Sequence, residues 1–103
     1  MVAVVYSTTD KIQDARRIAK TLVEEQLVAC VNIIPKMEST YRWKGKVENA
    51  NEVVIIAKTT DANVKKTIQR IKKLHTYETP AITVLPIIGG LKDYLDYIAN
   101  ETS

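Results

Sequence analysis

Residues 30–60, CVNIIPKMESTYRWKGKVENANEVVIIAKTT, decide the fold because they predict one long β-hairpin. Two arms rich in β-forming residues flank Lys44 and Gly45, which predict the turn between them. Pro35 interrupts the first arm, and because proline cannot donate to a sheet ladder it predicts a bulge or an edge there. At about 3.3 Å per residue, arms of about a dozen residues would span roughly 40 Å. The hairpin must therefore bend, or project from a domain of this length.

The segments on either side of the hairpin predict alternating strands and helices. In chain order they are a strand at residues 2–7, a helix from Asp10, a helix from Asp61 that ends before Pro80, a strand at residues 81–88 and a helix at residues 91–100. Asp10 with Gln13 three positions later resembles a capping box, and Asp61 is the expected cap of the second long helix. No linker or low-complexity tract divides residues 1–103, so a single domain is expected.

This order of elements predicts an α+β fold with one four-stranded antiparallel sheet. Two interleaved βαβ units around a hairpin give the ferredoxin-like βαββαβ plait, with both long helices on one face and the short closing helix added at the end. The central strands do not alternate, because residues 2–5 and 53–57 are apolar toward both faces. Three short helices cannot cover both faces, so a homo-oligomer is expected.

The composition excludes several classes of protein. The chain carries 15 Lys and Arg against 12 Asp and Glu, a net charge of +3, and one cysteine. This small basic surplus does not predict specific nucleic-acid binding, and the central strands offer only Tyr6 as a base-stacking aromatic. No glycine motif for nucleotides is present, so no nucleotide cofactor is expected. Without a membrane-length apolar run or a signal-peptide pattern, a cytoplasmic protein is expected.

The polar and aromatic residues that could carry function lie at one end of the hairpin, on its return arm as far as the start of the second long helix, and at the end of that helix. They are Tyr41, Trp43, Glu48, Glu52, Lys58, His75, Tyr77 and Glu78. His75 and Glu78 are candidate metal ligands, but two ligands make an incomplete site. His75 alternatively stabilises the carboxyl end of the helix through the dipole. No nucleophile–base pair is evident, so no enzymatic activity is expected.

Taken in order, five segments resemble the CutA family of divalent-cation tolerance proteins over essentially the whole chain. They are LVACVNIIP, STYRWKGKVENANEV, IIAKTT, LHTYETPAI and DYLDYI. The resemblance implies a tight homotrimer of ferredoxin-like subunits, similar to the PII signalling proteins, with a cleft at each subunit interface. It also implies tolerance to divalent cations, copper above all, with copper binding in some members and no assigned catalysis.

The resemblance also suggests which residues serve the clefts and where this chain departs from the family. Family copper binding uses a cysteine at the end of the first strand and two adjacent histidines after the second helix. This chain has Ser7 and Leu74 at two of these positions, keeps His75, and has Thr76 in place of the usual proline. At most weak copper binding that depends on His75 is therefore expected.

Two functions follow from the resemblance. The first is a trimeric protein of metal tolerance or metal binding, with His75 and Glu78 as its ligands. The alternative is a PII-like regulatory module that binds a small molecule or a protein partner at its subunit clefts. The interface-cleft residues are then expected to be Tyr41, Trp43, Glu52, Lys58 and Tyr77.

Overall fold

The computed structural model describes residues 1–102, and the predicted hairpin is its longest feature. Strand β2 (Cys30–Trp43) and strand β3 (Lys46–Thr60) pair antiparallel along nearly their whole length. Lys44 and Gly45 join them with φ values of 50° and 81°. Positive φ at both central residues is typical of the type I′ turn, whose twist matches that of the flanking strands. The predicted turn is confirmed.

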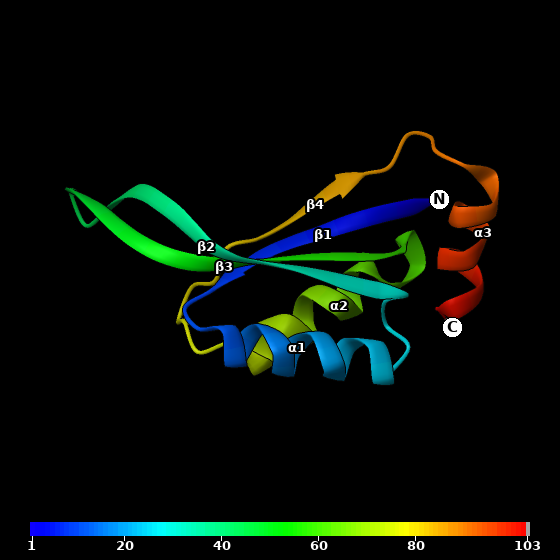
Figure 1. The fold of residues 1–103 in the computed structure, drawn as a ribbon, viewed down its shortest axis with the longest axis horizontal. Helices are drawn as coiled ribbons and strands as arrows, with labels where there is room; N and C mark the ends of the chain where they lie inside the picture. The colour runs from blue at the N-terminus through cyan, green and yellow to red at the C-terminus, as the bar shows by residue number, and fades with distance from the viewer. Residues whose placement is uncertain (103) are drawn as a thin grey trace.

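Pro35 marks a bulge, as its sequence position predicts. Ile34 pairs with Val54 and Met37 with Glu52, so β2 advances three residues while β3 advances two. Lys36 takes up the extra residue with φ of 60°. Beyond this bulge the hairpin projects past the rest of the sheet (Figure 1), and the molecule is 44 Å along its longest axis.

The remaining elements complete the expected plait. They are β1 (Val2–Thr9), α1 (Ile12–Glu24), α2 (Asp61–Leu74), β4 (Ile82–Pro86) and α3 (Lys92–Glu101). The strands form one antiparallel sheet in the order β2-β3-β1-β4. Helices α1 and α2 lie on one face of the sheet, and α3 stands at the end opposite the hairpin tip (Figure 1). No helix within residues 1–102 is long and apolar enough to cross a membrane.

The expected helix start at Asp10 needs correction, whereas α2 begins at Asp61 as expected and only its cap lies one residue earlier. Helix α1 begins at Ile12 with Lys11 as its N-cap, and α2 has Thr60 as its N-cap; neither cap side chain bonds to the helix. Strand β1 continues to Thr9, which pairs with Val53, so the chain turns into the helix later than the local pattern indicates. The fourth strand is likewise shorter than residues 81–88, because β1 pairs with it only as far as Pro86.

The two faces of the sheet are covered differently. Val5, Ile55 and Ile71 are fully buried in the core between the sheet and the two long helices. On the opposite face, Ile34 is 49% exposed and Leu85 is 51% exposed. We call this second surface the open face. Helix α3 covers only its far end, where Ile98 packs with Val2 and Ala29.

Candidate functional site

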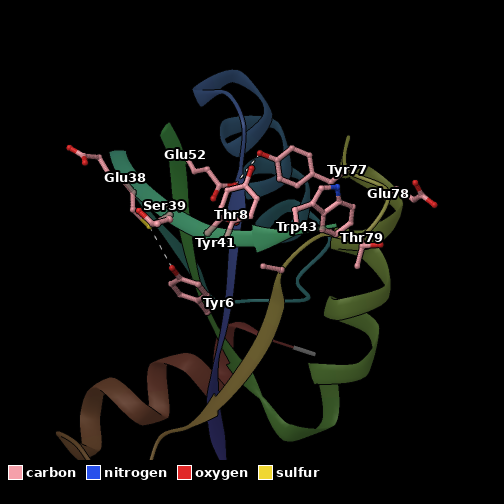
Figure 2. A pocket seen from close by; sticks show the side chains of 13 residues that line it. Tyr6, Thr8, Glu38, Ser39, Tyr41, Trp43, Glu52, Tyr77, Glu78 and Thr79 are labelled. Atoms are coloured by element: carbon pink, nitrogen blue, oxygen red, sulfur yellow. Dashed lines mark hydrogen bonds between the residues drawn. The ribbon is translucent and has the colours of Figure 1, made fainter. Parts of the chain in front are cut away.

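A cleft of about 750 Å³ opens between the outer hairpin, the open face and the loop that follows α2. Thirteen residues line it: Tyr6, Thr8, Met37, Glu38, Ser39, Thr40, Tyr41, Trp43, Glu52, Tyr77, Glu78, Thr79 and Ala81 (Figure 2). The bulge at Pro35 bends the hairpin arm and places Met37 opposite Glu52. The cleft is thus built by the same irregularity that shapes the hairpin, and its volume lies in the range of small-molecule sites, about 300–1,000 Å³.

Tyr77 and Glu52 meet inside this cleft. The Tyr77 hydroxyl donates to Oε2 of Glu52 at 3.0 Å, which joins the loop after α2 to strand β3 (Figure 2). Burial of the Tyr77 ring raises the pKa of its hydroxyl above the usual value, and the hydrogen bond to the Glu52 carboxylate raises it further. Tyr77 therefore stays a neutral donor, and Glu52 supplies the negative charge.

Both ring nitrogens of His75 are engaged with the backbone. Nδ1 accepts from the backbone N–H of Tyr77 at 3.0 Å, and Nε2 lies 2.6 Å from the carbonyl oxygen of Thr8. Because a carbonyl can only accept, Nε2 carries the proton, and the ring is held as one tautomer. His75 is also the C-cap of α2, and its own N–H donates to the Ile71 carbonyl at 2.9 Å. Its side chain fixes the loop after the helix.

The candidate metal ligands do not form a metal centre within one chain. His75 offers no free lone pair in this arrangement, and the Glu78 carboxylate points away from the cleft (Figure 2). Among residues 1–102, no three side chains of His, Cys, Asp or Glu lie close enough to hold an ion. A transition-metal site needs three or four such donors, so the residues present do not fit a resident copper or zinc ion.

Four of the five expected interface-cleft residues come together, and Lys58 does not. Tyr41, Trp43, Glu52 and Tyr77 all line the cleft. Lys58 lies six residues beyond Glu52 on β3, about 20 Å along the strand. There its Nζ donates to the Tyr94 hydroxyl at 3.0 Å and to Oδ1 of Asn32 at 3.1 Å, and the bond to Tyr94 raises the Lys58 pKa.

The sequence did not predict that residues of β1 line the cleft, nor that Ser7 lies in the core. Tyr6 and Thr8 reach the cleft because alternate residues of β1 face the open side, a pattern that strand parity predicts. Ser7 lies between them and faces the helices, fully buried, and its hydroxyl has no hydrogen-bond partner within residues 1–102. A cysteine at position 7 would therefore point into the core and not into this cleft.

Known proteins similar to this chain share one description. Residues 3–101 match the model of the family described as "CutA1 divalent ion tolerance protein". "Divalent-cation tolerance protein CutA" of Thermus thermophilus is 45% identical over 99% of this chain and 99% of its own length. The namesake protein of Archaeoglobus fulgidus is 43% identical over 95% of this chain and 94% of its own length. A solved structure of "Divalent cation tolerance protein (Cut A1)" from T. thermophilus superposes over both whole chains with a TM-score of 0.97 at 45% identity.

The expected cytoplasmic location is not supported by these relatives. "Protein CutA, chloroplastic" of Arabidopsis thaliana is 37% identical over 96% of this chain and 54% of its own length. A solved structure from A. fulgidus, 40% identical with a TM-score of 0.94, is described as "Periplasmic divalent cation tolerance protein CutA" and covers 98% of each chain. Location varies among similar proteins, since the shared fold does not determine the compartment.

Proposed function

Because this chain belongs to the family of CutA1 divalent ion tolerance proteins, we propose that it contributes to divalent-cation tolerance as a homotrimer without catalytic activity. The match extends over residues 3–101, so it includes the hairpin, both long helices and the cleft. The names of the relatives describe the tolerance and not how it arises. The trimer, the metal chemistry and the absence of catalysis rest on the physical arguments that follow.

The apolar open face is the observation that carries the proposal. Ile34 and Leu85 are about half exposed in the single chain, on a surface that also holds Tyr6 and Ile56. Contiguous apolar surface of this kind favours association. The strands at the two edges, β2 and β4, also present unpaired backbone groups that a neighbouring copy can pair. A closed ring of three copies, as the family resemblance implies, would cover Ile34 and Leu85, which lie outside the cleft lining, and would pair both edges.

Divalent-cation tolerance in this protein need not involve an ion held by one chain. A copper ion at His75 would have to displace its bond to Thr8 or to Tyr77, both of which fix the loop. Copper binding at this position is therefore expected to be weak. The groups available for catalysis are also restricted, because Ser7 is buried away from the cleft and His75 is bound to the backbone.

A PII-like regulatory module is the second candidate function, and the cleft favours it. About 750 Å³ is enough for a small ligand, and the lining offers aromatic rings beside polar groups. In this case the effect on cation tolerance would be indirect, through a ligand or partner bound at the cleft.

Two measurements test the proposed function. Light scattering at micromolar concentration should give about three times the chain mass of 11.6 kDa, and a monomer would contradict the trimer. Expression in a bacterial strain that lacks its own CutA relative and is sensitive to copper should restore growth on Cu(II), and failure to restore it would contradict the role in tolerance.

Calorimetry with Cu(II) then separates the two candidate functions. Weak binding that disappears in His75→Ala would support a direct metal role and require the ring to leave its two backbone partners. Binding that is unchanged in His75→Ala removes this side chain as a ligand and favours the PII-like module. The Thr76→Ala variant serves as the control, because Thr76 is exposed beside His75 and lies outside the cleft lining.

A further inference from the structure

The lining of the cleft combines aromatic rings with carboxylates and contains no cationic side chain. Four of its thirteen residues are aromatic and three are glutamates, whereas none is Lys, Arg or His; they are Tyr6, Tyr41, Trp43, Tyr77, Glu38, Glu52 and Glu78. The whole chain has the opposite balance, with a net charge of +3. Negative charge is thus concentrated where the surface is hollow, and low-dielectric walls strengthen its field.

Glu52 is the carboxylate that faces the interior of the cleft. It is half-buried, and among residues 1–102 it forms no ion pair. The Tyr77 hydroxyl binds Oε2 and so fixes the carboxylate in place, while no side chain or backbone group of residues 1–102 binds Oε1. Glu38 and Glu78 point outward at the rim (Figure 2). The cleft therefore holds one fixed, unpaired negative charge, and four aromatic rings line the same cleft.

The aromatic rings suit a cation of low hydration. The face of a tryptophan or tyrosine ring attracts an ammonium group, and the attraction grows when water is removed. Trp43 already attracts one within this chain, since Nζ of Lys44 lies 5.8 Å from its ring centroid. The remaining surface of Trp43, which is 50% exposed overall, borders the cleft together with Tyr41.

We propose that this cleft binds a small organic cation with an ammonium head, held by the Glu52 carboxylate and by the rings of Trp43, Tyr41 and Tyr77. A metal ion fits the same lining less well, because a hard cation needs several oxygen ligands and aromatic carbon supplies none. An ammonium compound gains from the charge and from the apolar walls together. This proposal goes beyond divalent-cation tolerance and requires no metal.

The single tryptophan makes the binding directly measurable. Trp43 is the only tryptophan in the chain, so its fluorescence reports on the cleft without interference. We would titrate the trimeric protein in EDTA with choline and, separately, with 3,3-dimethylbutan-1-ol, which has the same shape without the charge. Choline should change the fluorescence saturably, and the neutral alcohol should bind at least about tenfold more weakly. Equal binding of the two, or no saturable change with choline, would overturn the proposal.

Two glutamate variants locate the charge. Glu52→Gln keeps an acceptor for Tyr77 and removes the charge, so choline should bind about tenfold more weakly. Glu48→Gln is the matched control, because Glu48 lies exposed on the same strand and outside the cleft lining, and its affinity should be unchanged. Equal losses in both variants would show a diffuse surface attraction and overturn the proposal.

The remaining alternative is that a neighbouring copy fills the cleft. Choline that binds a monomeric variant and not the trimer would establish this packing and overturn the ligand site. The copper growth test is independent, since the choline titration contains no free metal ion. Failure of growth rescue with intact choline binding would remove the tolerance function alone, and the reverse result would remove only the ammonium site.

Discussion

Ile55 and Ile56 are consecutive residues of β3 that face opposite sides of the sheet, and the chain buries the two sides to different extents. Ile55 is fully buried against the helices, in a core with Ile18, Leu22 and Ile71. Ile56 points to the open face, where it is only partly covered and Leu85 is half exposed. The sequence is equally apolar at both positions. Both faces of the sheet are apolar, yet a single chain buries only the face that carries the two long helices.

The two faces of the sheet should therefore contribute to the free energy of unfolding in different ways. The helix-covered face is closed by contacts within the chain, so its contribution is independent of protein concentration. In the proposed trimer the open face would gain its burial from other copies, so its contribution would depend on association. The cleft lies where the open face meets the projecting hairpin, and the state of assembly should therefore affect its occupancy.

The largest expected effect is loss of the proposed trimer in Leu85→Glu. Leu85 pairs with Val4 on the open face and is 51% exposed in the single chain, so the subunit itself should tolerate a glutamate there. In a symmetric trimer the change would place three unpaired carboxylates at apolar contacts, which is strongly unfavourable. Light scattering at micromolar concentration should give the monomer mass.

Val23→Glu is the matched control for this variant. Val23 lies on α1 and is 41% exposed, a surface comparable to that of Leu85 but on the other side of the molecule. This variant should remain a trimer. If both variants stay trimeric, the open face is not the interface, and the comparison between the two faces fails.

Truncation of the two neighbouring isoleucines should separate folding from assembly. Ile55→Ala opens a cavity in the closed core and should lower the free energy of unfolding by about 2–5 kcal/mol at every protein concentration. Ile56→Ala should act mainly on association, so its effect on the midpoint of urea unfolding should grow as the protein is diluted. Urea unfolding measured over an about hundredfold range of protein concentration distinguishes the two variants. Equal and concentration-independent losses would show that both faces are closed within one chain.

Most of the fold was accessible from the sequence because its signals are local. The change of hydrophobic period at the ends of residues 30–60 and the Lys44-Gly45 turn were sufficient to predict the hairpin and the order of elements. The start of the first helix at Asp10 was wrong because pairing of Thr9 with Val53 lengthens β1, and that contact joins distant segments. Local capping patterns carry no information about such pairing.

The candidate site was predictable only in part, because its geometry depends on the bulge. Strand parity places Glu52 and Lys58 on one face of β3, but parity does not show that Lys58 belongs to a separate group with Tyr94 and Asn32. Met37 reaches the cleft through the extra residue at the bulge, whose register cannot be counted from the sequence. The backbone partners of His75 are likewise tertiary contacts.

The third expected effect concerns the His75 ring, which joins the end of α2 to the loop beside the cleft. His75→Ala removes the bonds to the Thr8 carbonyl and the Tyr77 N–H, and should lower the free energy of unfolding by about 1–3 kcal/mol. Thr76→Ala, at an exposed neighbour, should change it by less than about 0.5 kcal/mol. Thermal unfolding in EDTA provides the measurement. Similar losses in the two variants would contradict a structural role for the His75 ring.

The smallest effect is expected inside the closed face, at Ser7. Its hydroxyl is fully buried without a partner among residues 1–102, so Ser7→Ala should raise the free energy of unfolding by about 1 kcal/mol. Thr9→Val is the matched control two residues along β1, because the buried Thr9 hydroxyl donates to the Lys11 carbonyl at 3.2 Å. That variant should lose about 1 kcal/mol in the same urea titration. Opposite signs for two buried hydroxyls on one strand would show that hydrogen bonding, and not burial alone, sets their contributions to the closed face. Losses in both variants would mean that the Ser7 hydroxyl is bonded after all.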